Sequence, residues 1–381
     1  MVKRKVLLWL AGLCSAEGHG MIRLSRSIVF WVLVLFGLVA CGQQGSEADN
    51  KQVKPIEWKL VTSWPKGFPG LGLAPERLAE KINKLSQGRL VIRVYGAGEL
   101  VPSFEVFNAV SKGTAQMGHS AAYYWQDRIP AASFFAAVPF GMTSLEMSAW
   151  INNGGGLELW QELYDPYGVL PVPGGSTGAQ MGGWFNREIN TIEDFQGLKI
   201  RLAGYAAHVL KRIGSIPVSL SGGELFTALE TGAIDAAEWV GPYNDLAFGL
   251  HNAAKYYYYP GWNEPGALME FLINKDAFQS LPDDLQLIVI TAAQAVNQDM
   301  LDEYTVKNIQ ALNVMLREHE VDLRPFPPEV LAELKVLTQQ LLEEKSQTDP
   351  VFERIYSSYK LFLSEVRKYG KVTENADVNT D

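Results

Sequence analysis

Short apolar strands alternate with amphipathic helices along the first half of the chain, and this order restricts the fold more than any other feature. Strands are expected over residues 56–64 and 89–95, with a helix over residues 72–87 between them. Pro75 stands in the first turn of that helix and Gly88 follows its end, as is usual for helices. Repeated strand and helix units predict an α/β fold with a mostly parallel sheet.

The alternation continues towards the middle of the chain. Ser103 is expected to begin a helix that ends at Gly113, and a helix over residues 144–153 follows a capping-box pattern formed by Thr143 and Glu146. Further strands are expected over residues 179–185 and 198–202, and further helices over residues 206–213 and 223–231.

The pattern changes after Pro282, where residues 283–320 have the composition of one very long helix and residues 328–369 add more helix. Helices average about 11–12 residues, so this one could cross two lobes as a shared spine or reach into a partner. Four leucines recur at helical spacing in the last part: Leu331, Leu334, Leu337 and Leu341. This stripe favours a homodimer through the C-terminal helices about as much as packing on the chain's own lobes.

The N-terminus has the pattern of an export signal. Basic residues between positions 21 and 26 precede an apolar run over residues 28–40, which is shorter than the ~20 residues of a membrane-spanning helix. Leu-Val-Ala-Cys at residues 38–41 resembles the lipobox of bacterial lipoproteins. We therefore expect a signal peptide over residues 1–40 and lipidation of Cys41, with a membrane anchor as the alternative.

The regions that flank the folded body are polar. Residues 41–55 are expected to be the lipidated cysteine and a flexible tether, and residues 371–381 a flexible tail. Residues 1–20 hold another Met and another basic cluster before those of the expected signal. This duplication would be explained if Met21 were the true start of the protein. The expected location is the periplasm or the extracytoplasmic face of the membrane.

Charge and cysteine content exclude several classes of protein. The formal net charge is −9, and five of the basic residues lie in the first 40 positions, so the body is more acidic still. An acidic surface repels phosphate backbones, which excludes nucleic acid as a partner. The two cysteines, Cys14 and Cys41, both precede the body, so neither a disulfide nor a zinc cluster is expected there.

One stretch matches the nucleophile-elbow pattern G-x-S-x-G, with Ser176 at its centre. An elbow needs a strand before the serine and a helix after it. Gly182 and Gly183 interrupt the sequence that follows, which makes it poor helix material. No P-loop, dinucleotide fingerprint or H-E-x-x-H motif occurs in the sequence. A serine hydrolase is therefore only an alternative.

Oxygen donors and one arginine are the other candidates for a site. Gln180, Glu238 and Glu264 each lie beside an apolar or aromatic residue in separate segments. A carboxylate in such surroundings must be paired, protonated or bound to a cation, unless it projects into solvent. Arg201 stands on an expected strand, where it could face solvent or hold a carboxylate with its rigid fork.

Several motifs in one order carry a family resemblance. They are Gly-Ala-Gly-Glu-Leu at residues 96–100, Phe-Gln-Gly-Leu-Lys-Ile-Arg at 195–201, Phe-Thr-Ala-Leu-Glu-Thr-Gly-Ala-Ile-Asp at 226–235 and Glu-Trp-Val-Gly-Pro-Tyr-Asn-Asp at 238–245. Residues 58–316 resemble the DctP family of solute-binding proteins of TRAP (tripartite ATP-independent periplasmic) transporters. The Glu-Trp-Val-Gly-Pro form resembles the branch that binds 2-oxo acids or lactate.

The resemblance implies a two-lobed periplasmic-binding-protein-like α/β fold with long C-terminal helices that span the lobes. The first lobe would hold residues 56–172 and about 264–300. The second lobe would hold residues 173–263 and about 301–370, with the C-terminal helices. Such a protein is not an enzyme, and it would deliver a small organic acid anion to the TRAP permease in the membrane.

The resemblance also implies a site. Arg201 would pair the carboxylate of a 2-oxo or 2-hydroxy monocarboxylate such as pyruvate or lactate, and Tyr123, Tyr124, Gln180 and Asn244 would line the pocket. A cation would be bound by Gln180, Glu238, the Trp239 carbonyl and Glu264. Oxygen donors of this kind select a hard cation such as Ca²⁺ or Na⁺. The alternatives are a secreted lipoprotein hydrolase, using Ser176 or a metal at Glu238 and Glu264, and a binding protein that reports to a sensor.

Overall fold

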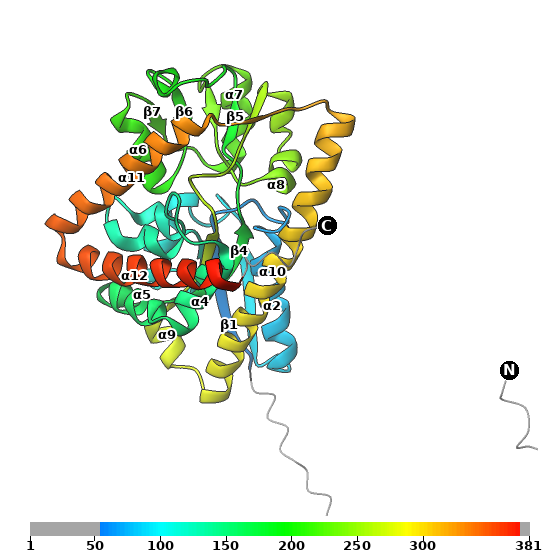
Figure 1. Ribbon diagram of the computed structural model, residues 1–381. Coiled ribbons are helices and arrows are strands. Elements are labelled where there is room, and N and C mark those ends of the chain that lie inside the picture. Colours follow the sequence, from blue (N-terminus) through cyan, green and yellow to red (C-terminus); the bar gives the residue numbers. More distant parts are fainter. Residues whose placement is uncertain (1–53, 374–381) are drawn as a thin grey trace, which may run out of the picture. The chain divides into compact units, whose positions relative to one another are not determined.

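The computed structural model describes residues 54–373, whose strands form two sheets (Figure 1). The sheet of the first lobe has the strand order β2-β1-β3-β10-β4. Its strands are β1 (Ile56–Thr62), β2 (Leu90–Tyr95), β3 (Met117–Ser120), β4 (Val169–Gly178) and β10 (Ala267–Asn274). Strand β1 pairs in parallel with β2 and β3, whereas β10 runs antiparallel between β3 and β4.

The sheet of the second lobe has the order β11-β9-β5-β8-β6-β7. Its strands are β5 (Gly183–Phe185), β6 (Lys199–Arg201), β7 (Ile216–Val218), β8 (Ala236–Ala237), β9 (Tyr256–Tyr259) and β11 (Asp322–Pro325). Strand β6 is parallel to β7 and β8, but β5 is antiparallel to β8 and β9. The predicted two-lobed α/β fold is confirmed, although both sheets are mixed because the chain crosses between them twice.

Helices cover both sheets. Those of the first lobe are α2 (Leu73–Leu85), α3 (Val106–Ser111), α4 (Ser144–Asn153), α5 (Gly156–Tyr164) and α9 (Lys275–Gln279), and those of the second are α6 (Gly204–Arg212), α7 (Leu225–Glu230) and α8 (Pro242–Ala247). Short 3-10 helices are η1 (Ser103–Glu105), η2 (Ala122–Trp125), η3 (Pro130–Phe135), η4 (Asp165–Tyr167), η5 (Ile192–Phe195), η6 (Gly222–Glu224) and η7 (Leu250–Asn252). The capping box predicted for α4 is present, since Thr143 and Glu146 each accept the other's backbone N–H.

Two crossing segments, residues 179–182 and 260–266, connect the sheets and lie against each other. The Gln180 backbone N–H donates to the Glu264 carbonyl at 3.1 Å. A Cβ at Gly261 would lie 2.1 Å from the Gln180 carbonyl oxygen, so only glycine permits this approach. The strand expected over residues 179–185 is therefore wrong in its first half. Residues 179–181 cross to the other lobe, and the first sheet continues to Gly178 instead of ending near residue 172.

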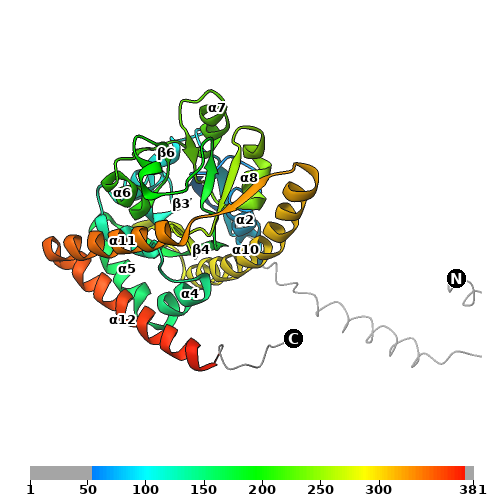
Figure 2. The ribbon, with the colours of Figure 1, turned by 45° about the horizontal axis from the view of Figure 1, so that its top comes forward.

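Helix α10 (Asp283–Glu318) is the predicted long helix, with 36 residues. At 1.5 Å per residue it is about 54 Å long. It packs on β4 and α2 of the first lobe and on α8 of the second, and both ribbon views show it extending from one lobe to the other (Figures 1 and 2). Val289, Val296, Met300 and Tyr304 lie on its buried side. The helix is therefore a spine shared by the lobes.

The helical region after Pro328 divides into α11 (Pro328–Thr348) and α12 (Pro350–Thr373). The break falls at Asp349, which is extended because it precedes a proline, and its carboxylate accepts from the backbone N–H groups of Val351 and Phe352. Helix α11 packs on α6, but α12 packs on η3, α4 and α5 of the first lobe. Assigning residues 350–370 to the second lobe was therefore wrong.

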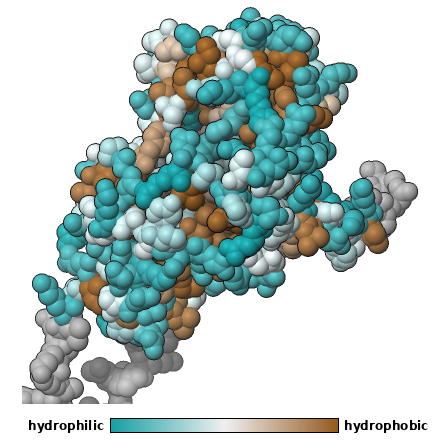
Figure 3. Space-filling view, turned by 90° about the vertical axis from the view of Figure 1, so that its left-hand side faces the viewer, coloured by the Kyte–Doolittle hydropathy of each residue, from teal (hydrophilic) through white to brown (hydrophobic). Residues whose placement is uncertain are grey.

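The leucine stripe of α11 is used inside the chain. Leu334 and Leu341 are buried, and Leu331 and Leu337 are partly buried against the core. The face shown in Figure 3 is mostly hydrophilic, with its hydrophobic side chains in separate small groups. The stripe therefore no longer argues for a homodimer.

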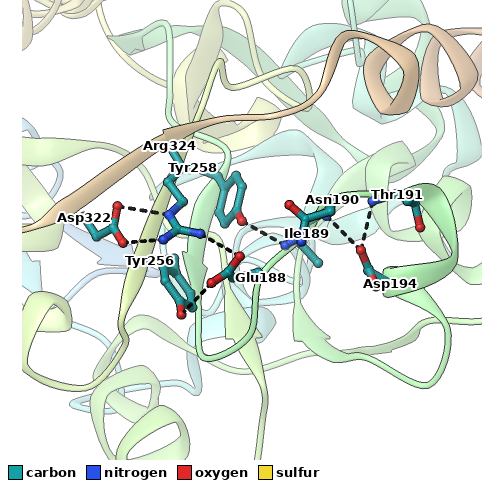
Figure 4. Close-up of polar contacts among 9 residues, drawn as sticks. All are labelled: Glu188, Ile189, Asn190, Thr191, Asp194, Tyr256, Tyr258, Asp322 and Arg324. Atoms are coloured by element: carbon teal, nitrogen blue, oxygen red, sulfur yellow. Dashed lines mark hydrogen bonds and ion pairs between the residues drawn. The ribbon is translucent and has the colours of Figure 1, made fainter.

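Arg324 fastens β11 to the second sheet (Figure 4). Its guanidinium pairs with Asp322 at 2.8 Å and with Glu188 at 2.9 Å. The same group lies over the Tyr256 ring, 4.2 Å from the centroid, and the Tyr256 hydroxyl donates to Glu188. The chain is thus anchored where it returns from α10.

None of the helices within residues 54–373 is long and apolar enough to cross a membrane. The predicted signal peptide, Cys41 and most of the tether lie outside the described residues, as do residues 374–381. Residues 371–373, expected in the tail, belong to α12.

Candidate binding site

The candidate residues follow the carboxyl ends of strands from both sheets. Trp64 comes just after β1, and Tyr123 and Tyr124 come just after β3. In the second lobe Arg201 ends β6, and Glu238 follows β8 directly. Ligands of open α/β sheets bind at this edge, because the chain leaves each strand there into a loop that can present side chains.

Two cavities meet at this edge. A narrow inner pocket is lined by Trp64, Leu71, Tyr123, Tyr124, Thr177, Gln180, Trp239, Val240 and Met269. An outer cavity of about 740 Å³ has walls that include Arg201, His208 and Lys211 of the second lobe. Tyr123 and Tyr124 line both cavities and separate them.

Arg201 is buried, with 3% of its side chain exposed. Nη1 donates to the Glu238 carbonyl at 2.5 Å, Nη2 to the Tyr124 hydroxyl at 3.3 Å, and the guanidinium carbon lies 4.9 Å from the Trp239 ring centroid. Burial opposes the charge, but Tyr124 and Glu238 outweigh it and keep the pKa of Arg201 above its ordinary value. A strand arginine that merely faces solvent does not fit this geometry.

Gln180, Glu238 and Glu264 are also buried, with exposed fractions of 4%, 1% and 3%. The Gln180 amide nitrogen donates to the Thr177 hydroxyl at 3.0 Å, which leaves Oε1 free. Within residues 54–373, Gln180 Oε1, both carboxylate oxygens of Glu238 and Oε2 of Glu264 accept no hydrogen bond. Buried oxygens rarely remain unpaired, so such a group calls for a partner from outside the chain.

The electrostatics point to the same conclusion. Burial raises the pKa of Glu238 well above its ordinary value, and Glu264 adds to this rise while Arg201 opposes it. Burial likewise raises the pKa of Glu264 to about 8 against the effect of Arg201. The nearest side-chain contact of Arg201 with Glu238 is 3.5 Å, so one arginine faces two buried carboxylates. Burial therefore disfavours the ionised state of both carboxyl groups, and for Glu238 the neighbouring charge of Glu264 adds to this effect.

The donor set fits a hard cation. Two carboxylates, one amide oxygen and the Trp239 backbone carbonyl are the kinds of ligand that Ca²⁺ and Na⁺ take. The described part of the chain contains no group of three or more His, Cys, Asp or Glu suited to a metal. A cation here would therefore depend on Gln180 and the backbone as well as on Glu238 and Glu264.

Asn244 lies elsewhere than expected. Its side-chain nitrogen donates to the Pro69 carbonyl at 2.9 Å, and its oxygen accepts from the Tyr304 hydroxyl at 2.6 Å. Asn244 lines neither of the two cavities, as is also true of Glu238 and Glu264, but unlike those carboxylates it has its hydrogen bonds within residues 54–373. Asn244 thus connects α8 to the loop after β1 and to α10.

Reasoning from the sequence missed five lining residues of the inner pocket: Trp64, Leu71, Thr177, Val240 and Met269. The position of Trp64 just after the first strand was an available signal, because the carboxyl ends of parallel strands meet at one edge. Nothing local marks Leu71 or Met269, which look like ordinary core residues.

Ser176 does not stand in an elbow. It lies within β4 and is buried, and its hydroxyl donates to the Ala267 carbonyl at 2.7 Å. His119 is engaged elsewhere, between the Trp64 indole and the Gly174 carbonyl. A strand followed by a crossing segment lacks the sharp strand-to-helix turn that exposes a nucleophile.

Comparison with known proteins identifies a family that this chain matches. The model of the bacterial extracellular solute-binding proteins, family 7 (DctP), matches residues 60–348. The monocarboxylate 2-oxoacid-binding periplasmic protein of Nostoc sp. is 39% identical over 337 residues, which are 88% of this chain and 92% of that protein.

Two solved structures are similar over nearly their whole length. The TRAP periplasmic solute-binding protein of Colwellia psychrerythraea, with bound calcium and pyruvate, is 40% identical with a TM-score of 0.83, covering 85% of this chain and 98% of that one. That of Pseudoalteromonas atlantica, with bound sodium and pyruvate, is 41% identical with a TM-score of 0.84, covering 86% and 100%. These relatives are solute-binding proteins of transport systems.

Proposed function

This chain belongs to family 7 of the bacterial extracellular solute-binding proteins, the DctP family of TRAP transporters, and on that premise we propose what it carries. It captures a small 2-oxo or 2-hydroxy monocarboxylate, such as pyruvate or lactate, together with Ca²⁺ or Na⁺, and delivers it to the membrane permease. The observation that carries this proposal is the set of buried oxygens of Gln180, Glu238 and Glu264 that accept no hydrogen bond within residues 54–373.

Charge balance explains why acid and cation would bind together. Glu238, Glu264 and a ligand carboxylate bring three negative charges, and Arg201 returns one positive charge. Two uncompensated negative charges in a buried pocket are costly, and a cation removes that cost. Ca²⁺ would neutralise them fully and Na⁺ by half. A 2-oxo or 2-hydroxy acid also offers two oxygens that can complete the shell of the cation.

Arg201 is suited to hold the carboxylate of the acid. Its planar fork can donate two hydrogen bonds to a carboxylate, and its contacts with the Glu238 carbonyl and Tyr124 fix its orientation in advance. A group that is already ordered loses less entropy on binding. Tyr123 and Tyr124 would close the pocket on the side of the outer cavity.

Calorimetry on chelator-treated protein tests the coupling. Pyruvate and lactate would be titrated without added ion, with Ca²⁺ and with Na⁺. We expect at least one ion to strengthen binding by about 5–150-fold, the usual range of coupling between linked sites, and the acid to strengthen ion binding by the same factor. Equal affinity in all three conditions would contradict the proposal.

The proposal also places the protein at the extracytoplasmic face of the membrane, anchored through Cys41. The lipobox-like residues 38–41 and the polar segment that follows support this. We expect Cys41→Ser to move the protein from the membrane fraction to the soluble fraction. A variant that stays in the membrane fraction would contradict anchoring through Cys41.

A further inference from the structure

We infer that Trp64 limits the length of the acid that the inner pocket accepts, and that His119 is the residue that positions Trp64. This inference rests on the proposed function and names a selectivity determinant within it.

Trp64 forms part of the wall of the inner pocket, with 1% of its surface exposed. Its carbonyl accepts from the Ala97 N–H at 2.8 Å, so the backbone is fixed where the chain leaves β1. Its ring centroid lies 6.1 Å from that of Trp239 and 6.1 Å from that of Tyr124. Both neighbours also contact Arg201, so the indole is packed against the groups that hold the arginine.

His119 fixes the indole from behind. The Trp64 Nε1–H donates to His119 Nδ1 at 2.9 Å, and His119 Nε2 lies 2.9 Å from the Gly174 carbonyl of β4. An indole nitrogen can only donate, so Nδ1 must accept and Nε2 must carry the proton. Burial lowers the pKa of His119 to about 4, which keeps the ring neutral near pH 7. The bridge from β3 to β4 thus allows Trp64 little freedom to rotate.

This bridge determines the chemistry of the wall. Because His119 takes the indole N–H, Trp64 presents only carbon to the pocket. Leu71, Val240 and Met269, which also line this pocket, have apolar side chains, so that among the described residues the unpaired indole N–H of the lining belongs to Trp239. A second carboxylate or a hydroxyl placed against this wall would lose its water without gaining a partner. A short alkyl group suits the wall, and a longer one would collide with a ring that cannot swing aside.

The test compares a short and a longer 2-oxo acid on the same protein. Calorimetry with saturating Ca²⁺ would measure pyruvate and 2-oxopentanoate on the full chain. We expect Trp64→Ala to shift the affinity ratio towards 2-oxopentanoate by about tenfold or more, since each methylene accommodated changes affinity by about 10-fold or more. Trp64→Phe should shift it in the same direction by less, and it keeps the test decisive if the alanine variant fails to fold.

The role of His119 can be tested with a conservative substitution that keeps both of its hydrogen bonds. Gln can accept from the Trp64 indole and donate to the Gly174 carbonyl, whereas Leu can do neither. We expect His119→Gln to keep the wild-type ratio and His119→Leu to shift it as Trp64→Phe does. Trp160→Phe is the matched control, because Trp160 is a buried tryptophan of the first lobe that stacks on Phe135 and borders neither cavity.

The outcomes separate this inference from the proposed function. If wild-type protein binds no 2-oxo acid with any ion, the proposed function fails and this inference falls with it. If wild-type protein binds pyruvate but both Trp64 variants keep the wild-type ratio, Trp64 does not set the limit and the proposed function stands. A His119→Leu ratio equal to that of wild type would remove the positioning role of His119.

Discussion

Two regions of the molecule contain buried carboxyl groups, and they differ in how those groups are paired. In the first lobe Glu270 is fully buried and accepts from the Trp125 indole at 2.6 Å and from the Tyr164 hydroxyl at 3.1 Å. Between the lobes Glu238 and Glu264 are almost as buried, yet Glu238 and Oε2 of Glu264 accept no hydrogen bond within residues 54–373. The carboxyl groups of the two regions are similarly buried, but among the described residues only that of the first lobe has both oxygens hydrogen-bonded.

The pKa values do not distinguish the two regions. Burial raises the pKa of Glu270 to about 8, and it raises that of Glu264 to about 8 as well. The pKa of a carboxyl group in the core is thus raised as far as that of one in the candidate site, so a shifted pKa alone identifies no site. The unpaired oxygens, gathered from separate segments around one arginine, distinguish the cleft from the core.

The largest expected effect comes from changing one carboxylate in each region. Glu264→Gln removes a charge from the proposed cation shell, and we expect it to weaken Ca²⁺-dependent pyruvate binding by about 100-fold, since losing a charged partner costs several kcal/mol. Glu270→Gln should stay within about threefold of wild type, because both Glu270 oxygens already have partners within the first lobe, Trp125 and Tyr164. Calorimetry measures both. Comparable losses in the two variants would mean that burial, and not pairing, determines the effect.

Arg201→Lys should have a smaller effect of about tenfold or more. Lysine keeps the positive charge, so the charge balance of the cleft is unchanged, but it loses the planar fork that can bind a carboxylate through two hydrogen bonds. The affinity for pyruvate at saturating Ca²⁺ would be measured, with Arg77→Lys as a matched control, because Arg77 pairs with Glu303 of α10 and lines neither cavity. Wild-type affinity in the Arg201 variant would remove this residue from the site.

The sequence predicted what local pattern and motif determine. The long α10, the capping box of α4 and the strand that carries Arg201 depend on periodicity and turn residues within a few positions of each other. The motifs also pointed to Gln180, Glu238 and Glu264, which the fold brings together from three segments. Each of these features can be recognised in a window of about 10–40 residues.

Features that depend on distant segments were not predictable in this way. Residues 179–181 leave the first sheet because their backbone N–H groups bond to distant segments. That of Gln180 donates to the Glu264 carbonyl of the other crossing segment, and that of Met181 donates to the Val240 carbonyl after β8. Asn244 faces Pro69 and Tyr304 rather than a cavity, because α10 and the loop after β1 enclose α8. Periodicity indicates that a side chain is buried, but it does not tell which surface covers it.

The smallest expected effect is on the pH dependence of the free energy of unfolding, to which Glu270 contributes. Glu270 has a pKa of about 8 in the folded protein against an ordinary value of 4.5, so between these values the native state holds a proton that the unfolded chain has released. Stability contributed by this group is therefore present below pH 4.5 and falls as pH rises towards 8, by at most about 1.4 kcal/mol per pH unit. Glu270→Gln cannot titrate, so its free energy of unfolding should depend less steeply on pH than that of wild type. At pH 5 the two proteins should be about equally stable, because an amide offers one acceptor for the Trp125 indole and one donor for the Tyr164 hydroxyl, as a protonated carboxyl group does. Urea denaturation at pH 5, 6, 7 and 8 gives both quantities, and parallel curves for the two proteins would show that Glu270 does not hold its proton in the folded state.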